Sequence, residues 1–317
     1  MVKLLKKILI LTLILIIGFF VLIFWESNRL VSSYANQRVE IKGALIKKYQ
    51  SEIERFEMKT IDGLKVSTWR FHTPKPKAIV IVLHDLQKMD ASSILDYGKF
   101  FKSAGYEAFC LDLRAHGFSK GKKICFGYEE TKDVRALIDW INQRPEYRGK
   151  KIILYGLGMG GAVAINTAAE LDEVKIVVSV NAFESIEHQL MDQCNKGKYI
   201  KSFLKVKFLK KVINYFYKPS VQFILALNYH VNPRKSSPRN NILKLSPRPV
   251  LIIHGEQERE ILIRHAQIIK NNASEGTELW IVKGKQHLVE LEILSPQNEW
   301  YQSHILDFIE HNLKLVD

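Results

Sequence analysis

Six short runs of mostly apolar residues constrain the fold of this chain more than any other feature of its sequence. Runs of this length are typical of strands that are buried on both faces of a parallel sheet. Segments with the apolar spacing of helices lie between them. The alternation predicts an α/β fold with a doubly wound, mostly parallel sheet. The six runs are residues 78–83, 108–113, 151–155, 175–180, 250–253 and 279–282, two further strands are expected at 57–60 and 65–71 around an Asp62-Gly63 turn, and the predicted helices are residues 91–103, 128–142, 160–171, 261–271 and 298–312.

The domain boundaries follow from where this alternation starts and where it fails. A length of 317 residues and an apolar content of 47% suit one large domain, which we place at residues 57–317. The alternation is interrupted once, and there we predict a helical cap at about residues 186–247. Residues 28–56 are polar and helix-compatible, and we expect them to link the domain to an N-terminal segment, residues 1–27.

The N-terminal segment has the pattern of a transmembrane helix. Residues 8–25 carry no charge, and Lys3, Lys6 and Lys7 precede them. Roughly 20 apolar residues are needed to cross the hydrocarbon layer. A cleaved signal peptide is the alternative, but its apolar region should be shorter and should end at a small-x-small site, which is missing here. We therefore predict an uncleaved single-pass anchor, with a cytoplasmic N-terminus by the positive-inside rule and the folded domain on the extracytoplasmic side.

A tight turn follows the third apolar run. Residues 155–162 read Y-G-L-G-M-G-G-A, and a helix rich in small residues is expected directly after them. A strand, a sharp turn and a helix with the sequence G-x-S-x-G form the nucleophile elbow of α/β-hydrolases. Here residues 156–160 read G-x-G-x-G, so Gly158 stands at the position of the nucleophilic serine.

Five further segments resemble the α/β-hydrolase superfamily, particularly its membrane-anchored bacterial branch near lysophospholipases and serine peptidases. The resemblance covers the chain from residue 58 to its C-terminus, and the order nucleophile, acid, histidine is the one that this fold uses. The five segments are His84-Asp85, where the family usually has His-Gly at its oxyanion turn; D-L-R-A-H-G-F-S at 112–119, similar to D-x-R-G-H-G-x-S; F-G-Y-E at 126–129 followed by Asp133, similar to the start of the helix before the elbow strand; P-V-L-I-I-H-G-E-Q-E at 249–258, similar to P-V-L-x-I-H-G-x-x-D with Glu258 at the acid position; and residues 283–287, which end at the expected catalytic histidine, His287.

The resemblance implies a set of site residues. It assigns His287 and Glu258 as the catalytic pair, and the backbone N–H groups of Met159 and Leu86 as the oxyanion-hole donors. In a working member a serine attacks an acyl carbonyl, and the histidine takes its proton. Gly158 preserves the turn but removes the attacking oxygen. We therefore predict a pseudoenzyme without serine-hydrolase turnover, which acts by binding an acyl or lipid-like ligand or a protein partner.

Several alternatives stay open at this point. The protein could instead hydrolyse acyl esters, lipids or peptides, through a His287–Glu258 dyad or a non-standard nucleophile. The same pair could equally be structural. If the register differs, Glu256 or Glu260 would replace Glu258.

Asp85 is a second, independent departure from the family pattern. If it points inward, its charge opposes acyl transfer, and otherwise it is a solvated loop residue. His84, Arg114 and His116 are expected to brace the loops around the site.

The predicted cap is strongly basic. Residues 193–255 contain 13 Lys and Arg residues and no Asp or Glu. Such a segment suits an anionic membrane surface, and we hypothesise that the cap rests on the membrane that holds the anchor. A solvated basic face is the alternative, and no nucleic acid partner is expected.

Neither a metal nor a cofactor is predicted. Cys110, Cys125 and Cys194 show no metal-ligand spacing, and Cys110 is expected to be a small buried hydrophobe. The glycines at 156, 158 and 161 also fit the dinucleotide motif G-x-G-x-x-G, but that motif should open the first βαβ unit and be followed by an acid about 20 residues later.

Overall fold

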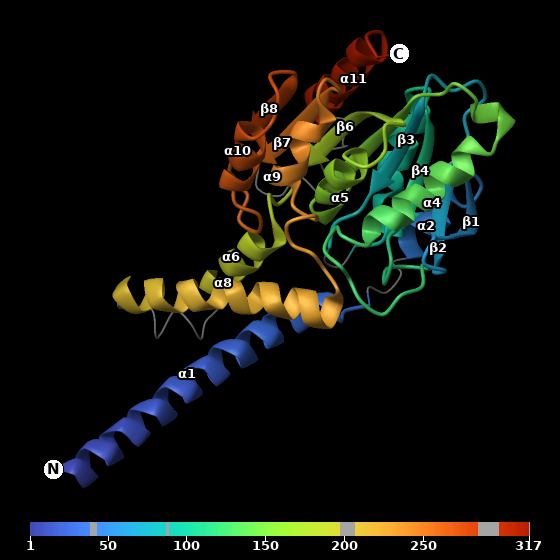
Figure 1. The fold of residues 1–317 in the computed structure, drawn as a ribbon. Helices are drawn as coiled ribbons and strands as arrows, with labels where there is room; N and C mark the ends of the chain where they lie inside the picture. Colours follow the sequence, from blue (N-terminus) through green and yellow to red (C-terminus); the bar gives the residue numbers. More distant parts are fainter. Residues whose placement is uncertain (39–42, 87–88, 197–206, 285–297, 317) are drawn as a thin grey trace.

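An eight-stranded sheet forms the centre of the protein (Figure 1). The computed structural model describes residues 1–38, 43–86, 89–196, 207–284 and 298–316. The strand order is β1-β2-β4-β3-β5-β6-β7-β8; β2 pairs antiparallel with β1 and with β4, and all other neighbours are parallel. The predicted α/β architecture is therefore confirmed. The strands are β1 (Ile53–Lys59), β2 (Lys65–Phe71), β3 (Ile79–Leu83), β4 (Glu107–Asp112), β5 (Ile152–Leu157), β6 (Val174–Val180), β7 (Val250–Gly255) and β8 (Thr277–Val282).

Helices cover both faces of the sheet, because side chains along each central strand alternate between the two faces. In β3, Ile79 and Ile81 belong to one buried cluster and Val80 and Val82 to the other. The first cluster contains residues of α4 (Glu130–Asn142), α5 (Met159–Ala168) and α10 (Arg264–Asn271), and the second contains residues of η1 (Ala91–Ile94), α3 (Leu95–Ser103) and α11 (Glu299–Leu313). A further short 3-10 helix, η2 (Pro145–Tyr147), precedes β5.

The N-terminal helix is longer than the sequence pattern indicates. Helix α1 (Val2–Ala35) is long and apolar enough to cross a membrane, and it continues without a break past residue 27. Its C-terminal half buries Ile23, Val31 and Ala35, which recur at multiples of four residues and so share one face. This packing explains why the helix does not end where the apolar run ends. The expected linker at 28–56 thus contains the end of α1, the short helix α2 (Gly43–Tyr49) and the start of β1.

The segment between β6 and β7 is helical, as the sequence predicts. It contains α6 (Ile186–Lys196), α8 (Lys207–Tyr229), α9 (Pro238–Asn241) and η3 (Ile242–Leu245). Helix α8 lies beside the C-terminal half of α1, and both helices contribute residues to the buried cluster that covers α4 and α5 (Figure 1).

The packing of α3 on the sheet generates a stability prediction. A Cβ at Gly98 would lie 2.5 Å from the Phe71 ring and 2.8 Å from Cys110 Sγ. We expect Gly98→Ala to lower the free energy of unfolding by about 1–3 kcal/mol through overpacking, although alanine alone favours a helix. Gly276→Ala is the matched control, because no atom lies within 4 Å of its added Cβ. Equal urea midpoints for the two variants in detergent would contradict this packing.

Candidate functional site

The site is built around the sharp turn between β5 and α5. Gly158 has φ 53° and ψ −115°, a conformation that residues with a side chain rarely adopt. Its N–H donates to the Val180 carbonyl oxygen at 2.8 Å, which ties the turn to the end of β6. The turn is therefore the strained strand-to-helix connection that the sequence predicts.

Two flanking glycines allow this turn to pack closely. A Cβ at Gly156 would lie 2.1 Å from the Gly160 carbonyl oxygen, and a Cβ at Gly160 would lie 2.4 Å from the Leu83 carbonyl oxygen. Either distance is far below a van der Waals contact. The outer glycines of G-x-G-x-G are thus required by the approach of β3, β5 and α5, whatever residue stands between them.

The side chain of Asp85 fills the space beside Gly158. A Cβ at Gly158 would lie 1.9 Å from Asp85 Oδ1 and 2.0 Å from its Cγ. The strand register brings the two residues together, because Leu83 of β3 pairs with Gly156 of β5 and each chain then continues for two more residues. A carboxylate from the loop after β3 therefore occupies the position where a serine side chain would begin.

Both predicted oxyanion-hole donors point at this carboxylate. Asp85 Oδ1 accepts a hydrogen bond from Leu86 N–H at 2.6 Å and another from Met159 N–H at 2.7 Å. Met159 is the first residue of α5, where the helix dipole also favours a negative charge. Asp85 therefore points inward, and the hypothesis of a solvated loop residue is wrong.

The sequence suggests that Gly158 and Asp85 are independent departures from the family pattern, but in the structure they form one structural change. Glycine at 158 leaves the volume that the Asp85 carboxylate fills, and a larger residue there would collide with it. The carboxylate in turn accepts from Met159 N–H, which at the start of α5 has no intrahelical partner, and from Leu86 N–H of its own loop.

Two buried histidines hold the turn that carries Asp85. His84 Nδ1 donates to the Asp85 carbonyl oxygen at 2.8 Å, while its Nε2 accepts from Leu113 N–H at 3.1 Å. Because that carbonyl belongs to the same peptide unit as Leu86 N–H, His84 fixes the direction of one donor. Burial, with a smaller effect of neighbouring His116, lowers the pKa of His84 well below its usual value. His84 is therefore a neutral bracing residue.

His116 and Arg114 brace the surrounding loops. His116 Nε2 lies 3.1 Å from the Leu86 carbonyl oxygen, and burial lowers the pKa of His116. Arg114 forms an ion pair with Asp133 of α4 at 2.7 Å and another with Asp62 of the β1–β2 turn at 3.0 Å. These contacts agree with the structural roles that the sequence suggests for all three residues.

The acid position lies at the end of the neighbouring strands. Glu258 is buried after β7, whereas Glu256 and Glu260 are exposed. Glu258 Oε2 accepts from Asn181 Nδ2 at 2.8 Å, and its Oε1 accepts from Glu260 N–H at 2.6 Å. Of the three carboxylates that the sequence leaves open, Glu258 is the one directed into the protein.

Asn181 is a site residue that sequence reasoning missed. It follows β6 with φ 49°, and its Oδ1 accepts from Gly255 N–H at 3.0 Å while its amide donates to Glu258. It therefore joins the end of β6, next to the Gly158 turn, to the acid loop after β7. An asparagine directly after a buried strand is a signal that could have found it, because asparagine tolerates positive φ.

His287, the predicted catalytic histidine, lies outside the described residues.

The described residues contain no group of three His, Cys, Asp or Glu side chains that could hold a metal ion. All three cysteines are buried and free, and burial raises the pKa of the Cys110 thiol, as expected of a small hydrophobe inside β4.

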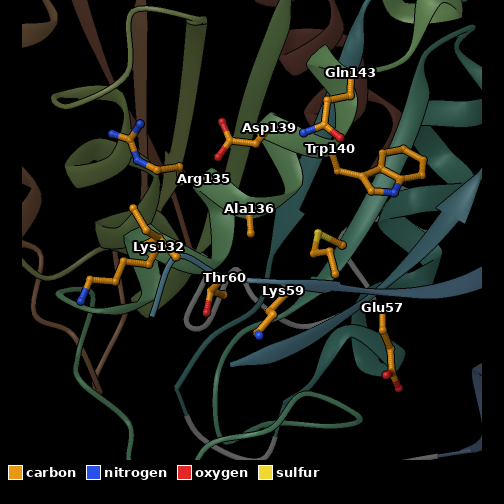
Figure 2. A pocket seen from close by; sticks show the side chains of 11 residues that line it. Glu57, Lys59, Thr60, Lys132, Arg135, Ala136, Asp139, Trp140 and Gln143 are labelled. Carbon is orange, nitrogen blue, oxygen red and sulfur yellow. The ribbon is translucent and has the colours of Figure 1, made fainter. Parts of the chain in front are cut away.

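A groove of about 460 Å³ lies between β1 and α4 (Figure 2). Glu57 and Lys132 are among its lining residues, and none of the residues of the Gly158 turn is.

Comparison with known proteins supports the same fold. Residues 74–222 match the family model described as serine aminopeptidase, S33. The uncharacterized protein YqkD of Bacillus subtilis (strain 168) is 21% identical over 234 residues, which are 73% of this chain and 71% of YqkD. The esterase Pf2001 of Pyrococcus furiosus has a TM-score of 0.66 at 20% identity, over 87% of this chain and 98% of its own. A membrane phospholipase A has a TM-score of 0.58 at 16% identity, over 97% of this chain and 98% of its own.

The sheet topology, the Gly158 turn and the comparisons with known proteins all indicate the same fold. The chain has the α/β-hydrolase fold, and in it the Gly158 turn is occupied by a carboxylate from the neighbouring loop.

The neutral state of His84 generates a prediction about pH. Because its folded pKa lies below the unfolded value near 6.5, its contribution to stability is present above about pH 6.5 and is lost as the pH falls. Between about pH 7 and pH 5 the loss should reach up to about 2 kcal/mol. We expect His84→Asn, which keeps an amide donor but does not titrate, to be less stable at pH 7 and to remove this loss.

The measurement is thermal unfolding of both proteins across this pH range. Asp112, whose pKa is raised to about 7 by burial, acts in the opposite direction but is present in both proteins. The difference between the two curves therefore isolates His84. A difference that does not change with pH would show that His84 is not held neutral.

Proposed function

We propose that this protein is a membrane-anchored member of the α/β-hydrolase superfamily that performs no serine-hydrolase turnover and acts by binding. The observation that carries the proposal is the pair of hydrogen bonds from Leu86 and Met159 N–H to Asp85 Oδ1. In a serine hydrolase, donors of this kind stabilise the negative oxygen of the tetrahedral intermediate. Here a carboxylate oxygen of the chain itself already accepts from both. An acyl substrate would meet neither an attacking hydroxyl nor an open oxyanion site.

The proposed ligand is an acyl or lipid-like molecule, and a protein partner is the alternative. The structural neighbours named as an esterase and a membrane phospholipase A favour an acyl ligand, although their sequence similarity is low. The site offers such a ligand a half-buried carboxylate rather than a nucleophilic hydroxyl. Recognition would therefore depend on this charge and on the cap, without cleavage of the ligand.

The packing of α1 supports a retained anchor. Ile23, Val31 and Ala35 of α1 are buried in the same cluster as residues of α4, α5 and α8. Removal of the helix as a signal peptide would expose this apolar surface. We propose that α1 crosses the membrane with Lys3, Lys6 and Lys7 on the cytoplasmic side, which would place the folded domain on the extracytoplasmic side.

Labelling with a fluorophosphonate probe tests the loss of turnover. We expect no label on the wild-type protein and little on Gly158→Ser, because the new Cβ would collide with the Asp85 carboxylate. The double variant Gly158→Ser/Asp85→Gly should be labelled at residue 158. Its hydrolysis of a short-chain p-nitrophenyl ester should exceed the wild-type rate by at least roughly 100-fold, since a nucleophilic serine contributes about 10⁶-fold in a serine protease.

Two controls make this result specific. Gly276→Ser/Asp85→Gly places a serine away from the turn and should remain unlabelled. Adding His287→Ala to the active double variant should abolish its hydrolysis, which tests the histidine that the sequence predicts. Probe attached to any residue of the wild-type site, or ester hydrolysis by wild-type protein that His287→Ala removes, would refute the proposal.

A second candidate function is hydrolysis by a carboxylate nucleophile, which the position of Asp85 favours. Carboxylates form covalent intermediates in several enzyme classes. Attack of Asp85 Oδ2 on an epoxide carbon would form an ester bond and break the ring C–O bond, and the alkoxide would take a proton from water. The hydroxide left by that proton transfer would then add to Cγ, and Leu86 and Met159 N–H would hold the negative charge on Oδ1. The bond from Cγ to the diol oxygen would break, that oxygen would take the proton of the added hydroxyl, and the carboxylate would be restored.

An aryl glycidyl epoxide distinguishes the two candidates. If Asp85 is a nucleophile, peptide mass spectrometry should find the adduct on Asp85, and Asp85→Asn should prevent it. Glu256→Gln removes an exposed carboxylate that follows β7 and should leave the adduct unchanged. Absence of an adduct on Asp85, with intact protein and excess epoxide, would discard this candidate and leave binding as the proposed function.

A further inference from the structure

Helix α8 exposes a face made only of apolar residues. From residue 212 to residue 229, the exposed positions are Tyr215, Pro219, Phe223, Ala226 and Leu227, which we name the docking face. Tyr215 is 75% exposed, Phe223 56% and Leu227 58%. At about 100° per residue these five positions fall within an arc of about 120°. A helix that faces water carries polar residues on such an arc, so this face is unusual for a protein surface.

The opposite face of α8 is apolar as well. Val221, Ile224 and Leu225 are fully buried in the cluster that covers α4 and α5. The single charged residue between positions 212 and 229 is Lys218, and its Nζ lies 2.9 Å from His188 Nε2 of α6. The docking face therefore carries no charged residue, and the residues behind it are already buried in the core.

Contacts with α1 fix the level of α8 along the predicted transmembrane helix. Phe216 packs on Phe19 and Phe20, with ring centroids 5.9 and 5.1 Å apart, and Phe223 packs on Phe24 at 6.3 Å. These partners on α1 belong to the end of the uncharged run at 8–25.

Further along both helices the contacts become polar. Asn228 Nδ2 donates to Asn28 Oδ1 at 3.1 Å, and Tyr229 OH donates to Ser32 Oγ at 3.0 Å. The change from aromatic to polar contacts lies just beyond the apolar run, where a membrane boundary would fall.

We propose that the docking face is a second membrane-binding surface, which inserts into the boundary between acyl chains and headgroups beside α1. The proposal rests on the proposed function, since it requires α1 to be a membrane anchor. Aromatic and aliphatic side chains next to a transmembrane helix suit this boundary. Because the other side of α8 packs into the domain core, insertion would hold the domain in one orientation against the bilayer.

The charges around α8 fit an anionic lipid surface. In the sequence, Lys207, Lys210 and Lys211 begin the helix, and exposed Arg234 and Lys235 follow it. Basic groups at both ends of an apolar face are typical of interfacial helices that bind anionic lipid. The membrane contact expected of the cap thus combines an apolar face with flanking positive charge.

Lipid quenching of a site-specific fluorophore tests the docking face. The full chain is reconstituted in nanodiscs that contain phosphatidylglycerol, and single cysteines at 223 or 227 are labelled with the environment-sensitive dye NBD. The native cysteines are buried, so the introduced thiol is the accessible one. We expect lipid carrying a quencher near the headgroup to quench both sites several-fold more than matched control sites at Ile61 and Leu243, which are exposed apolar residues elsewhere on the domain.

A label at residue 14, inside the uncharged run 8–25 of α1 and read with lipid that carries its quencher on the acyl chain, separates failure of this proposal from failure of the anchor. Quenching at 14 together with quenching at 223 no stronger than at 61 would overturn the docking face alone. No quenching at 14 would overturn the anchor and, with it, this inference. A blue-shifted label at 223 that lipid quenchers do not reach would show that a second copy or another protein covers the face, which would also overturn the proposal.

Discussion

The site depends on one interaction, in which a carboxylate oxygen of Asp85 accepts hydrogen bonds from the N–H groups of Leu86 and Met159. Bonds from backbone N–H groups to an ionised oxygen are stronger than those between neutral groups, and the start of α5 adds the favourable end of a helix dipole. The turn therefore carries its own anion. Gly158 makes this possible, because a side chain at that position would occupy the same space.

The residues that hold Asp85 against the Gly158 turn follow the C-terminal ends of neighbouring parallel strands. Asp85 follows β3, the Gly158 turn follows β5, and Asn181 follows β6. Asn181 forms hydrogen bonds with Gly255, the last residue of β7, and with Glu258 in the loop after it. His84 is held neutral by burial and fixes one of the two donors. The turn between β5 and α5 thus has the form of a nucleophile elbow, and a carboxylate instead of a hydroxyl lies at its centre.

The N-terminal helix and the cap form one structural unit with the domain. α1 and α8 pack along each other and share the apolar cluster on the α4 and α5 face of the sheet. The sequence draws attention to the positive charge of the cap, whereas the structure adds an apolar face on α8. Both features suit the surface of a bilayer, and α8 lies beside the helix that is long enough to span one.

Much of the fold could be predicted from the sequence, because buried strands and amphipathic helices have distinct periods. β2 has the predicted bounds, and other strands differ by a few residues because strand ends depend on pairing with neighbours. The length of α1 could not be predicted, since its last ten residues are polar in part and are helical through their packing on the domain.

By itself the sequence determined the α/β architecture, the glycine-rich turn and the absence of a hydroxyl at residue 158. Each of these depends only on the local pattern of residues or on the identity of a single residue. Only the tertiary structure decided where Asp85 points, which of three glutamates is buried, and which face of α8 is exposed. The physical reason is that each depends on contact between segments far apart in the chain. Asp85 meets Gly158 because β3 and β5 are neighbours in one particular register, and no local pattern encodes that pairing.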